Sequence, residues 1–187
     1  MCIALRHQFD EFVQLTDEEF EYACSFFHAT KFNKHSLVIQ TGDVVDREYF
    51  VVKGLLKTFV TDENGKEHIL QFAMENWWVS DYQALNTNER AGFNIECLED
   101  VEVLYFSLAD KNKLCDEMPK IERFFRMKTT FGFLNLQKRV MVLIKNDALS
   151  RYKQLYEQYP TLFQRVPKSM IAAYLGVTRE TLSRLSI

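Results

Sequence analysis

The sequence has few of the residues that interrupt or cross-link a chain. Its 187 residues include only six glycines, three prolines and four cysteines. So few glycines and prolines leave no long flexible linker, and a chain of this length is expected to form one or two domains. The cysteines (Cys2, Cys24, Cys97 and Cys115) are widely spaced and form no Cys-x-x-Cys pair. This spacing excludes a clustered zinc or iron–sulfur site and favours buried free thiols.

Long hydrophobic runs are also absent. No apolar stretch approaches the roughly 20 residues that cross a bilayer. The segment 1–10 lacks the apolar centre of a secretory signal peptide. We therefore expect a cytoplasmic protein with no membrane partner.

The usual signatures of enzymes and metal sites are missing as well. The four histidines (His7, His28, His35 and His68) form no His-x-His pair, so neither haem nor the metal centre of a cupin-like jelly-roll enzyme is expected. The chain contains no P-loop, nucleophile elbow or dinucleotide fingerprint. A cupin-like enzyme is the weaker alternative, and we expect a protein that is not an enzyme.

Apolar residues, in contrast, are abundant. Hydrophobic residues make up 47% and aromatic residues 14% of the chain, with sixteen phenylalanines, which is ample for a folded core. The charges are unevenly distributed: segment 138–187 has nine Lys/Arg against three Asp/Glu (+6), and segment 1–137 has 14 against 23 (−9). A basic end on an acidic body is typical of a protein whose C-terminus meets phosphates, although a solvated charged helix is the alternative.

Apolar periodicity divides the chain into blocks. Spacings of three and four predict a helix over 8–29, with Thr16 and Glu19 as a capping box. Short strands separated by turns then predict a β-sandwich or barrel, with a hairpin tip at Asn64-Gly65. Strands are expected at 35–40, 48–53, 55–61, 68–73, 93–98 and 101–106.

A long helix is predicted from Pro119 to about Ile144, roughly 40 Å in length. Apolar side chains occur along all of it: Ile121, Phe124, Phe125, Phe131, Leu134, Val140 and Met141. One small domain cannot bury so long a stripe, so we expect this helix to pair with its copy in a second subunit. A helix that only covers its own core is the alternative. A further helix is expected over 148–159.

The segment 168–187 has the spacing of a DNA-binding helix-turn-helix. Ile171, Leu175, Leu182 and Leu185 are expected to face the core, and Gly176 can end the first helix with φ > 0. Thr178 can cap the second helix. The residues left facing outward are Arg179, Glu180, Ser183 and Arg184, in the part of the helix that enters the major groove in this motif.

Four motifs in this order resemble the cAMP-receptor/fumarate-nitrate-regulator (Crp/Fnr) family of bacterial transcription factors. They are Leu37-Val38-Ile39-Gln40-Thr41-Gly42-Asp43, Tyr49-Phe50-Val51-Val52-Lys53-Gly54, Cys97-Leu98-Glu99-Asp100-Val101-Glu102-Val103-Leu104 and the terminal helix-turn-helix. Arg151-Tyr152-x-x-Leu, Pro160 and Arg165-Val166-Pro167 resemble the variant common in Bacteroidetes-type bacteria.

The resemblance implies an α+β fold in three parts: a jelly-roll, cyclic-nucleotide-binding-like sensor domain with an N-terminal helix (1–115), a dimerisation helix (116–145) and a helix-turn-helix domain (146–187). It also implies a homodimer on palindromic double-stranded DNA, with RNA polymerase as a further candidate partner. Relatives extend the recognition helix and often add a wing, so a sequence that stops at Ile187 implies that the wing is absent.

By the resemblance, Arg179, Glu180 and Arg184 read base edges, because arginine pairs with guanine and glutamate accepts from cytosine. Lys168, Thr178 and Ser183 are placed for phosphates.

The sensor motif departs from the family's pattern. Cyclic-nucleotide binders use a Gly-Glu pair and, about ten residues on, an Arg-Ser or Arg-Thr pair. Here these positions are Ser80-Asp81 and Ala91-Gly92, with Arg90 one residue early. Asp81 and Arg90 are the candidate ligand-binding residues, but a one-residue shift turns a side chain to the other face of a strand. A cyclic nucleotide is therefore not expected, and the effector is left open between another small ligand and none.

The resulting interpretation is a sequence-specific DNA-binding transcriptional regulator. The alternative is a ligand-binding or interaction module with a vestigial DNA-binding end.

Overall fold

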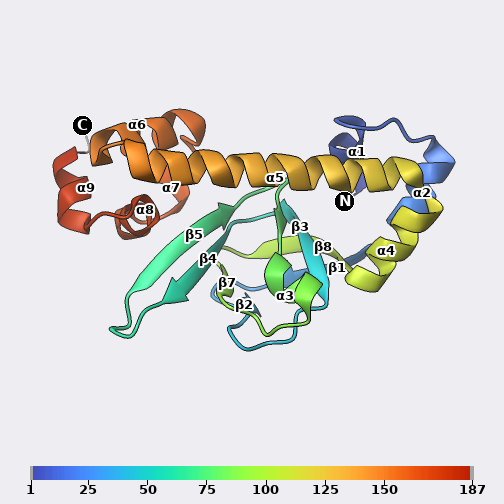
Figure 1. Ribbon diagram of the computed structural model, residues 1–187, viewed down its shortest axis with the longest axis horizontal. Coiled ribbons are helices and arrows are strands. Elements are labelled where there is room, and N and C mark those ends of the chain that lie inside the picture. Colours follow the sequence, from blue (N-terminus) through green and yellow to red (C-terminus); the bar gives the residue numbers. More distant parts are fainter. Residues whose placement is uncertain (1, 186–187) are drawn as a thin grey trace. The chain divides into compact units, whose positions relative to one another are not determined.

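The computed structural model describes residues 2–185, with the side chains of Cys2 and Leu185 outside the described part. Two helices, a block of strands and a further series of helices follow one another (Figure 1). The strands are β1 (His28–Phe32), β2 (Leu37–Ile39), β3 (Arg47–Lys53), β4 (Leu56–Thr61), β5 (Glu67–Ala73), β6 (Trp78–Val79), β7 (Asn94–Cys97) and β8 (Val101–Ser107). The helices are α1 (Cys2–Asp10), α2 (Asp17–Cys24), α3 (Tyr82–Thr87), α4 (Leu108–Glu117), α5 (Pro119–Lys145), α6 (Ala148–Gln158), α7 (Leu162–Arg165), α8 (Lys168–Leu175) and α9 (Arg179–Leu185).

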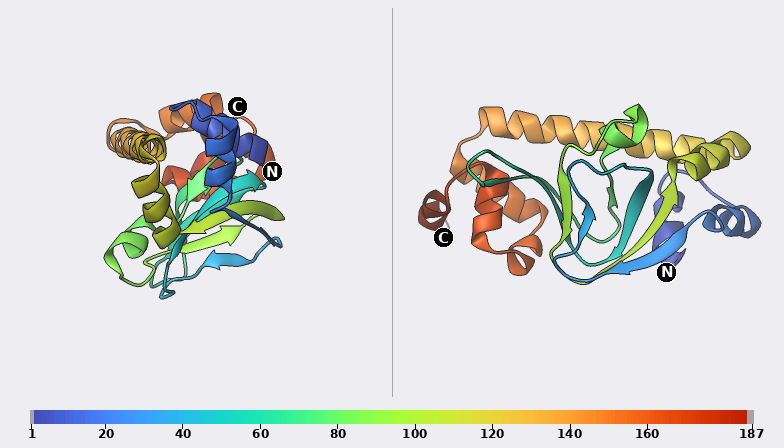
Figure 2. Two further views of the ribbon diagram at one scale, coloured as in Figure 1. Left: turned by 90° about the vertical axis from the view of Figure 1, so that its right-hand side faces the viewer. Right: turned by 90° about the horizontal axis from the view of Figure 1, so that it is seen from below.

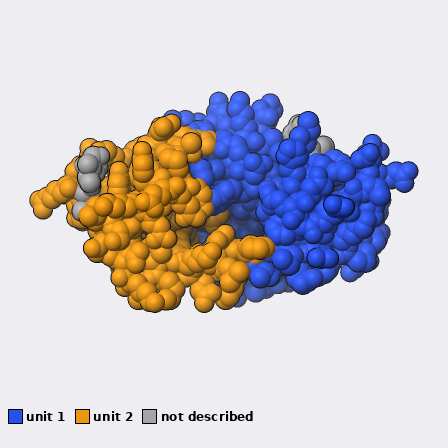
Figure 3. All heavy atoms as spheres, turned by 90° about the horizontal axis from the view of Figure 1, so that it is seen from above, with its two compact units in different colours: residues 1–58, 72–130 blue, residues 59–71, 131–187 orange. Residues whose placement is uncertain are grey.

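The chain divides into two compact units (Figure 3). Unit 1 comprises Met1–Thr58 and Phe72–Thr130, and unit 2 comprises Phe59–Gln71 and Phe131–Ile187. The boundaries fall inside β4, β5 and α5, so these elements run from one unit into the other. The tip of the β4–β5 hairpin therefore belongs to the same unit as α6 to α9.

Two four-stranded sheets form the β block, in the orders β1-β8-β3-β6 and β2-β7-β4-β5. Within unit 1 the sheets face each other (Figure 2) across a shared core. Val51 and Val103 of the first sheet and Leu56 and Ile95 of the second are fully buried in that core. Neighbouring strands that are distant in sequence are typical of a jelly roll, which confirms the predicted α+β fold.

A second core, rich in aromatic residues, covers the other face of the first sheet. Phe50 and Phe106 project from it toward α1, α2, α4 and the start of α5. The ring centroids of Phe9 and Phe124 lie 4.6 Å apart, and those of Phe106 and Phe125 lie 5.5 Å apart. Such aromatic pairs add to the free energy of burying their surface, so they fix the beginning of α5 to the sheet.

The prediction of one helix over 8–29 is wrong. α1 ends at Asp10, α2 begins at Asp17, and β1 occupies the end of the predicted range. The predicted capping box is confirmed, because the Thr16 hydroxyl accepts from the Glu19 amide and the Glu19 carboxylate accepts from the Thr16 amide. The apolar spacing continued across the break because both helices pack on the same aromatic core.

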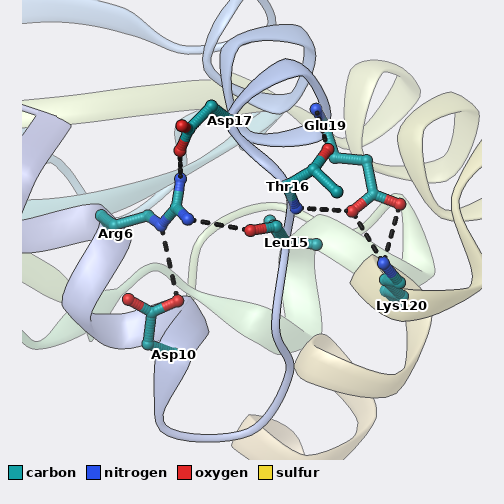
Figure 4. A network of polar contacts seen from close by, with 7 residues as sticks. All are labelled: Arg6, Asp10, Leu15, Thr16, Asp17, Glu19 and Lys120. Atoms are coloured by element: carbon teal, nitrogen blue, oxygen red, sulfur yellow. Dashed lines mark hydrogen bonds and ion pairs between the residues drawn. The ribbon is translucent and has the colours of Figure 1, made fainter.

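A polar network around this capping box joins the N-terminal helices to α5 (Figure 4). The Arg6 guanidinium donates to Asp17 Oδ1 at 3.1 Å and to the Leu15 carbonyl at 2.8 Å. Lys120 Nζ, at the second position of α5, donates to both oxygens of Glu19 at 2.8 and 2.7 Å. This pairing is the main cause of the lowered pKa of Glu19.

The other predicted elements correspond to β2–β5, β7, β8, α5 and α6 within a few residues at each end, whereas β1, β6, α3 and α7 were missed. The hairpin tip at Asn64-Gly65 is confirmed, although only Gly65 has a positive φ, of 77°. Asp62 Oδ1 accepts from the amides of Asn64 and Lys66, which closes this turn.

Candidate nucleic-acid interface

The helix-turn-helix consists of α8 and α9 packed on α6. Ile171, Ala172 and Leu175 of α8 are buried together with Leu182 of α9 and Leu155 of α6. The predicted inward positions are therefore confirmed for Ile171, Leu175 and Leu182. The other face of α9 is left to solvent.

The turn between the two helices has the predicted local geometry. Gly176 lies in the left-handed region with φ 68°, and its amide bonds to carbonyls in the last turn of α8. The Thr178 hydroxyl accepts from the Thr181 amide at 3.2 Å, which caps the start of α9. A glycine C-cap and a threonine N-cap thus fix the angle at which the chain enters α9.

All six residues that the sequence assigned to DNA are exposed: Lys168, Thr178, Arg179, Glu180, Ser183 and Arg184. Five of them lie together on α9 and its cap, and Lys168 begins α8. The pKa of Glu180 is lowered, first by its own backbone amide and then by Thr178, Arg179 and Arg184. Glu180 therefore presents a carboxylate, a hydrogen-bond acceptor, between two arginines.

Two arginines counted in the basic C-terminal segment have internal partners. Arg151 Nη1 donates to the Leu175 carbonyl at 2.6 Å. Arg139 Nη2 donates to the Tyr174 carbonyl at 3.0 Å, and its guanidinium lies 3.6 Å from the centroid of the Tyr174 ring. These side chains complete the C-terminal cap of α8. The sequence predicts that the last carbonyls of α8 need hydrogen-bond donors. It does not show which arginine supplies them.

The second half of α5 exposes a regular apolar seam. Phe133, Leu136, Val140 and Leu143 follow one another at spacings of three, four and three residues, and all are exposed. This is the a/d pattern of a helix that packs on another helix. Tertiary packing within the chain leaves this seam uncovered.

The two candidate ligand-binding residues, Asp81 and Arg90, lie in different surroundings. Asp81 is only 2% exposed, and its two oxygens accept from the Ala84 and Gly92 amides at 3.1 and 2.9 Å. Its carboxylate thus caps α3 and holds the following loop. The Arg90 side chain is exposed, and its backbone forms an isolated bridge with Val44.

A buried glutamate that the sequence did not single out links α3 to α4. Glu48 on β3 is 4% exposed and accepts from the Tyr82 hydroxyl and from Lys111 Nζ, both at 2.7 Å. Lys111 Nζ also lies 4.4 Å from the centroid of the Phe125 ring. The pKa of Tyr82 is raised because a phenolate would be desolvated beside this carboxylate.

A cyclic nucleotide needs a cation for its phosphate, and the residues at the sensor motif do not fit one well. Gly92 and Ala91 occupy the positions of the family's arginine pair, and the Asp81 oxygens are already bonded to amides. Among the described residues, no cluster of His, Cys, Asp or Glu is arranged to hold a metal ion. The same part of the chain contains no helix that could span a membrane.

Comparison with known proteins agrees with this architecture. Residues 29–118 match the model of the cyclic nucleotide-binding domain. The chain is 21% identical to the cAMP-activated global transcriptional regulator CRP of Salmonella typhimurium over 182 residues, which cover 91% of this chain and 86% of that protein. It is 26% identical to the transcriptional regulatory protein btr of Bordetella pertussis over 155 residues, covering 76% and 63%.

Solved structures share the fold. FixK2 from Bradyrhizobium japonicum superposes with a TM-score of 0.74 at 16% identity, over 85% of this chain and 82% of that one. The c-di-GMP responsive global regulator CLP of Xanthomonas campestris gives a TM-score of 0.73 at 14% identity, over 91% and 89%. The chain thus contains a segment that matches the cyclic nucleotide-binding domain, is similar over most of its length to the transcriptional regulator CRP, and shares the fold of FixK2.

Proposed function

We propose that this protein is a non-enzymatic, sequence-specific DNA-binding transcriptional regulator of the Crp/Fnr type that acts in the cytoplasm as a homodimer on a palindromic site. The observation that carries the proposal is α9, which buries Leu182 and exposes Arg179, Glu180, Ser183 and Arg184. One face is anchored, and the other offers hydrogen-bond donors and an acceptor of the kinds that read base edges. We assign residues 1–115 to sensing, 116–145 to dimerisation and 146–187 to DNA binding.

The seam on α5 supports the dimer. Burying four large apolar side chains against the same four of a second copy would remove them from water and align two recognition helices. In a two-fold dimer these helices meet half-sites one helical turn apart, about 34 Å. RNA polymerase is a further candidate partner.

We assign base reading to Arg179, Arg184 and Glu180, with guanine for the arginines and cytosine for the glutamate. Lys168, Thr178 and Ser183 are assigned to phosphates. Thr178 also caps α9, so its contact with a DNA phosphate would align this helix with the major groove.

The effector is proposed to differ from a cyclic nucleotide. A phosphate placed at the sensor motif would meet the buried Asp81 carboxylate, and a charge that lacks a partner is costly to desolvate. Asp81 would then hold α3, and Arg90 would serve an effector only after movement of its loop.

The test is selection of binding sites from random duplex DNA by the full chain, followed by anisotropy titrations. We expect a palindromic site whose affinity falls linearly on a log–log plot against salt. Arg179→Ala should cost about 1–3 kcal/mol and relax one base position. Arg123→Ala, which removes an exposed arginine on α5, is the matched control and should leave the sequence preference unchanged. Failure to select any sequence preference would overturn the proposal and favour the vestigial-end alternative.

A further inference from the structure

Arg139 of α5 joins two elements that are far apart in the sequence. Its Nη2 donates to the Ile69 carbonyl at 3.2 Å and to the Tyr174 carbonyl at 3.0 Å. Ile69 lies in the β4–β5 hairpin and Tyr174 near the end of α8, and all three residues belong to unit 2. Burial lowers the pKa of Arg139, but an arginine stays charged at neutral pH.

The hairpin side of this contact is well ordered by its own bonds. Asp62 Oδ2 bonds to His68 Nε2 at 2.8 Å, while Asp62 Oδ1 closes the tip turn. Ile69 itself is 4% exposed, so the strand beside Arg139 is buried. Both strands of the hairpin continue into the sheet β2-β7-β4-β5. A shift of that sheet would therefore move the Ile69 carbonyl.

The helix side of the contact determines the turn before α9. The last carbonyls of a helix have no partner within it and need donors from elsewhere. Here Gly176 supplies one, Arg151 bonds to the Leu175 carbonyl and Arg139 bonds to the Tyr174 carbonyl. Arg151 connects α6 to α8. Arg139 shares one nitrogen between α8 and the hairpin, so a change at either carbonyl affects the bond to the other.

We propose that Arg139 is a latch that couples the β4–β5 hairpin to the helix-turn-helix. Displacement of the hairpin loosens the cap of α8 and with it the turn that positions α9. The latch does not require a particular effector, because any event that shifts β4 and β5 acts on it. Its consequence for DNA rests on the proposed function, whereas the coupling itself does not.

Hydrogen–deuterium exchange on the full chain tests the coupling without DNA. In Arg139→Gln we expect exchange at least tenfold faster both in the hairpin (62–71) and at the end of α8 (172–178). Lys138→Gln, at the neighbouring exposed cation on α5, is the matched control and should change neither segment. Faster exchange in 172–178 alone would reduce Arg139 to a simple helix cap and overturn the latch.

A second variant tests the direction of the coupling. Asp62→Ala opens the hairpin tip, which is remote from α8 in the sequence. In the otherwise wild-type chain, Asp62→Ala should speed hydrogen–deuterium exchange in 172–178. Added to Arg139→Gln, it should give no further increase over Arg139→Gln alone. Equal effects in both backgrounds, or none, would contradict the latch. If Arg139→Gln fails to fold, Arg139→Lys, which keeps the charge but loses the shared nitrogen, takes its place.

DNA binding provides the functional arm. Arg139→Gln should weaken binding to the selected palindrome at least fivefold, since α9 is less well positioned, and Lys138→Gln should change it less than twofold. If Arg139→Gln speeds exchange in both segments but leaves the affinity for DNA unchanged, the latch does not control DNA binding. If the wild type selects no sequence, the proposed function fails, and the exchange results still decide whether the hairpin and α8 are coupled.

Discussion

The two halves of α5 are alike in sequence and opposite in environment. In the first half, Ile121 and Phe124 are fully buried and Phe125 is 6% exposed, packed on the aromatic core of unit 1. In the second half, Phe133 is 64% and Leu136 is 60% exposed. The apolar stripe thus serves two partners in succession, the chain's own sheet and, as we propose, a second copy of the helix.

The largest expected effect contrasts one phenylalanine from each half. Phe124→Ala should lower the free energy of unfolding by about 3–5 kcal/mol, because it empties a site among Phe9, Phe125 and Trp78. Phe133→Ala should change it by less than about 0.5 kcal/mol at protein concentrations low enough to keep the chain monomeric. Urea denaturation followed by tryptophan fluorescence measures both. Similar losses in the two variants would show that the halves are not different in the isolated chain.

The next prediction concerns association. Leu136→Glu should raise the dissociation constant of the dimer at least about 100-fold, because each copy loses an apolar contact and gains a charge in the seam; this equals about 2.7 kcal/mol. Asn135→Glu adds the same charge one residue away, off the seam, and should change the constant less than about threefold. Sedimentation equilibrium measures both variants. Equal weakening by the two would place the dimer contact elsewhere.

The smallest effect concerns the core between the two sheets, to which Cys97 belongs, in contrast to the aromatic core that anchors the first half of α5. Burial raises the pKa of the Cys97 thiol from 9.0 to about 12. Below pH 9 the thiol is neutral in both states and its titration changes nothing. As pH rises from 9 toward 12, only the unfolded chain ionises, so stability is lost.

Unfolding measured from pH 8 to pH 10 tests this titration. The stability difference between the wild type and Cys97→Ala should shrink by about 1 kcal/mol over that range, following the 1.36 kcal/mol of each pKa unit. A constant difference would show that the thiol is accessible to water in the folded state.

Local sequence features predicted several elements well. Thr16 and Glu19 identified a helix start, Gly176 and Thr178 identified the turn of the helix-turn-helix, and Pro119 marked the beginning of α5. Each of these signals acts over a few residues, through φ preferences or through a side chain that reaches its own backbone. The helix over 8–29 failed because apolar spacing reports which face is buried and does not show where the backbone breaks.

The candidate site was predictable only in part. The outward set on α9 follows from helix periodicity once Leu182 is inward. The roles of Arg139, Arg151, Glu48 and Asp81 do not, because their partners lie elsewhere in the chain: Ile69 is 70 residues from Arg139, and Lys111 is 63 residues from Glu48. In the sequence Arg139 and Arg151 looked like two more charges for phosphates.

The sequence by itself determined the order of the parts, the length of α5 and the position of the helix-turn-helix, since these depend on short-range periodicity and capping. The tertiary structure decided which half of α5 is covered, that Asp81 bonds to amides and that Arg139 bridges a hairpin and a helix. Those outcomes depend on which distant groups of the chain come within hydrogen-bond reach of one another. These contacts, and the burial that makes an unpaired polar group costly, exist only in the folded chain.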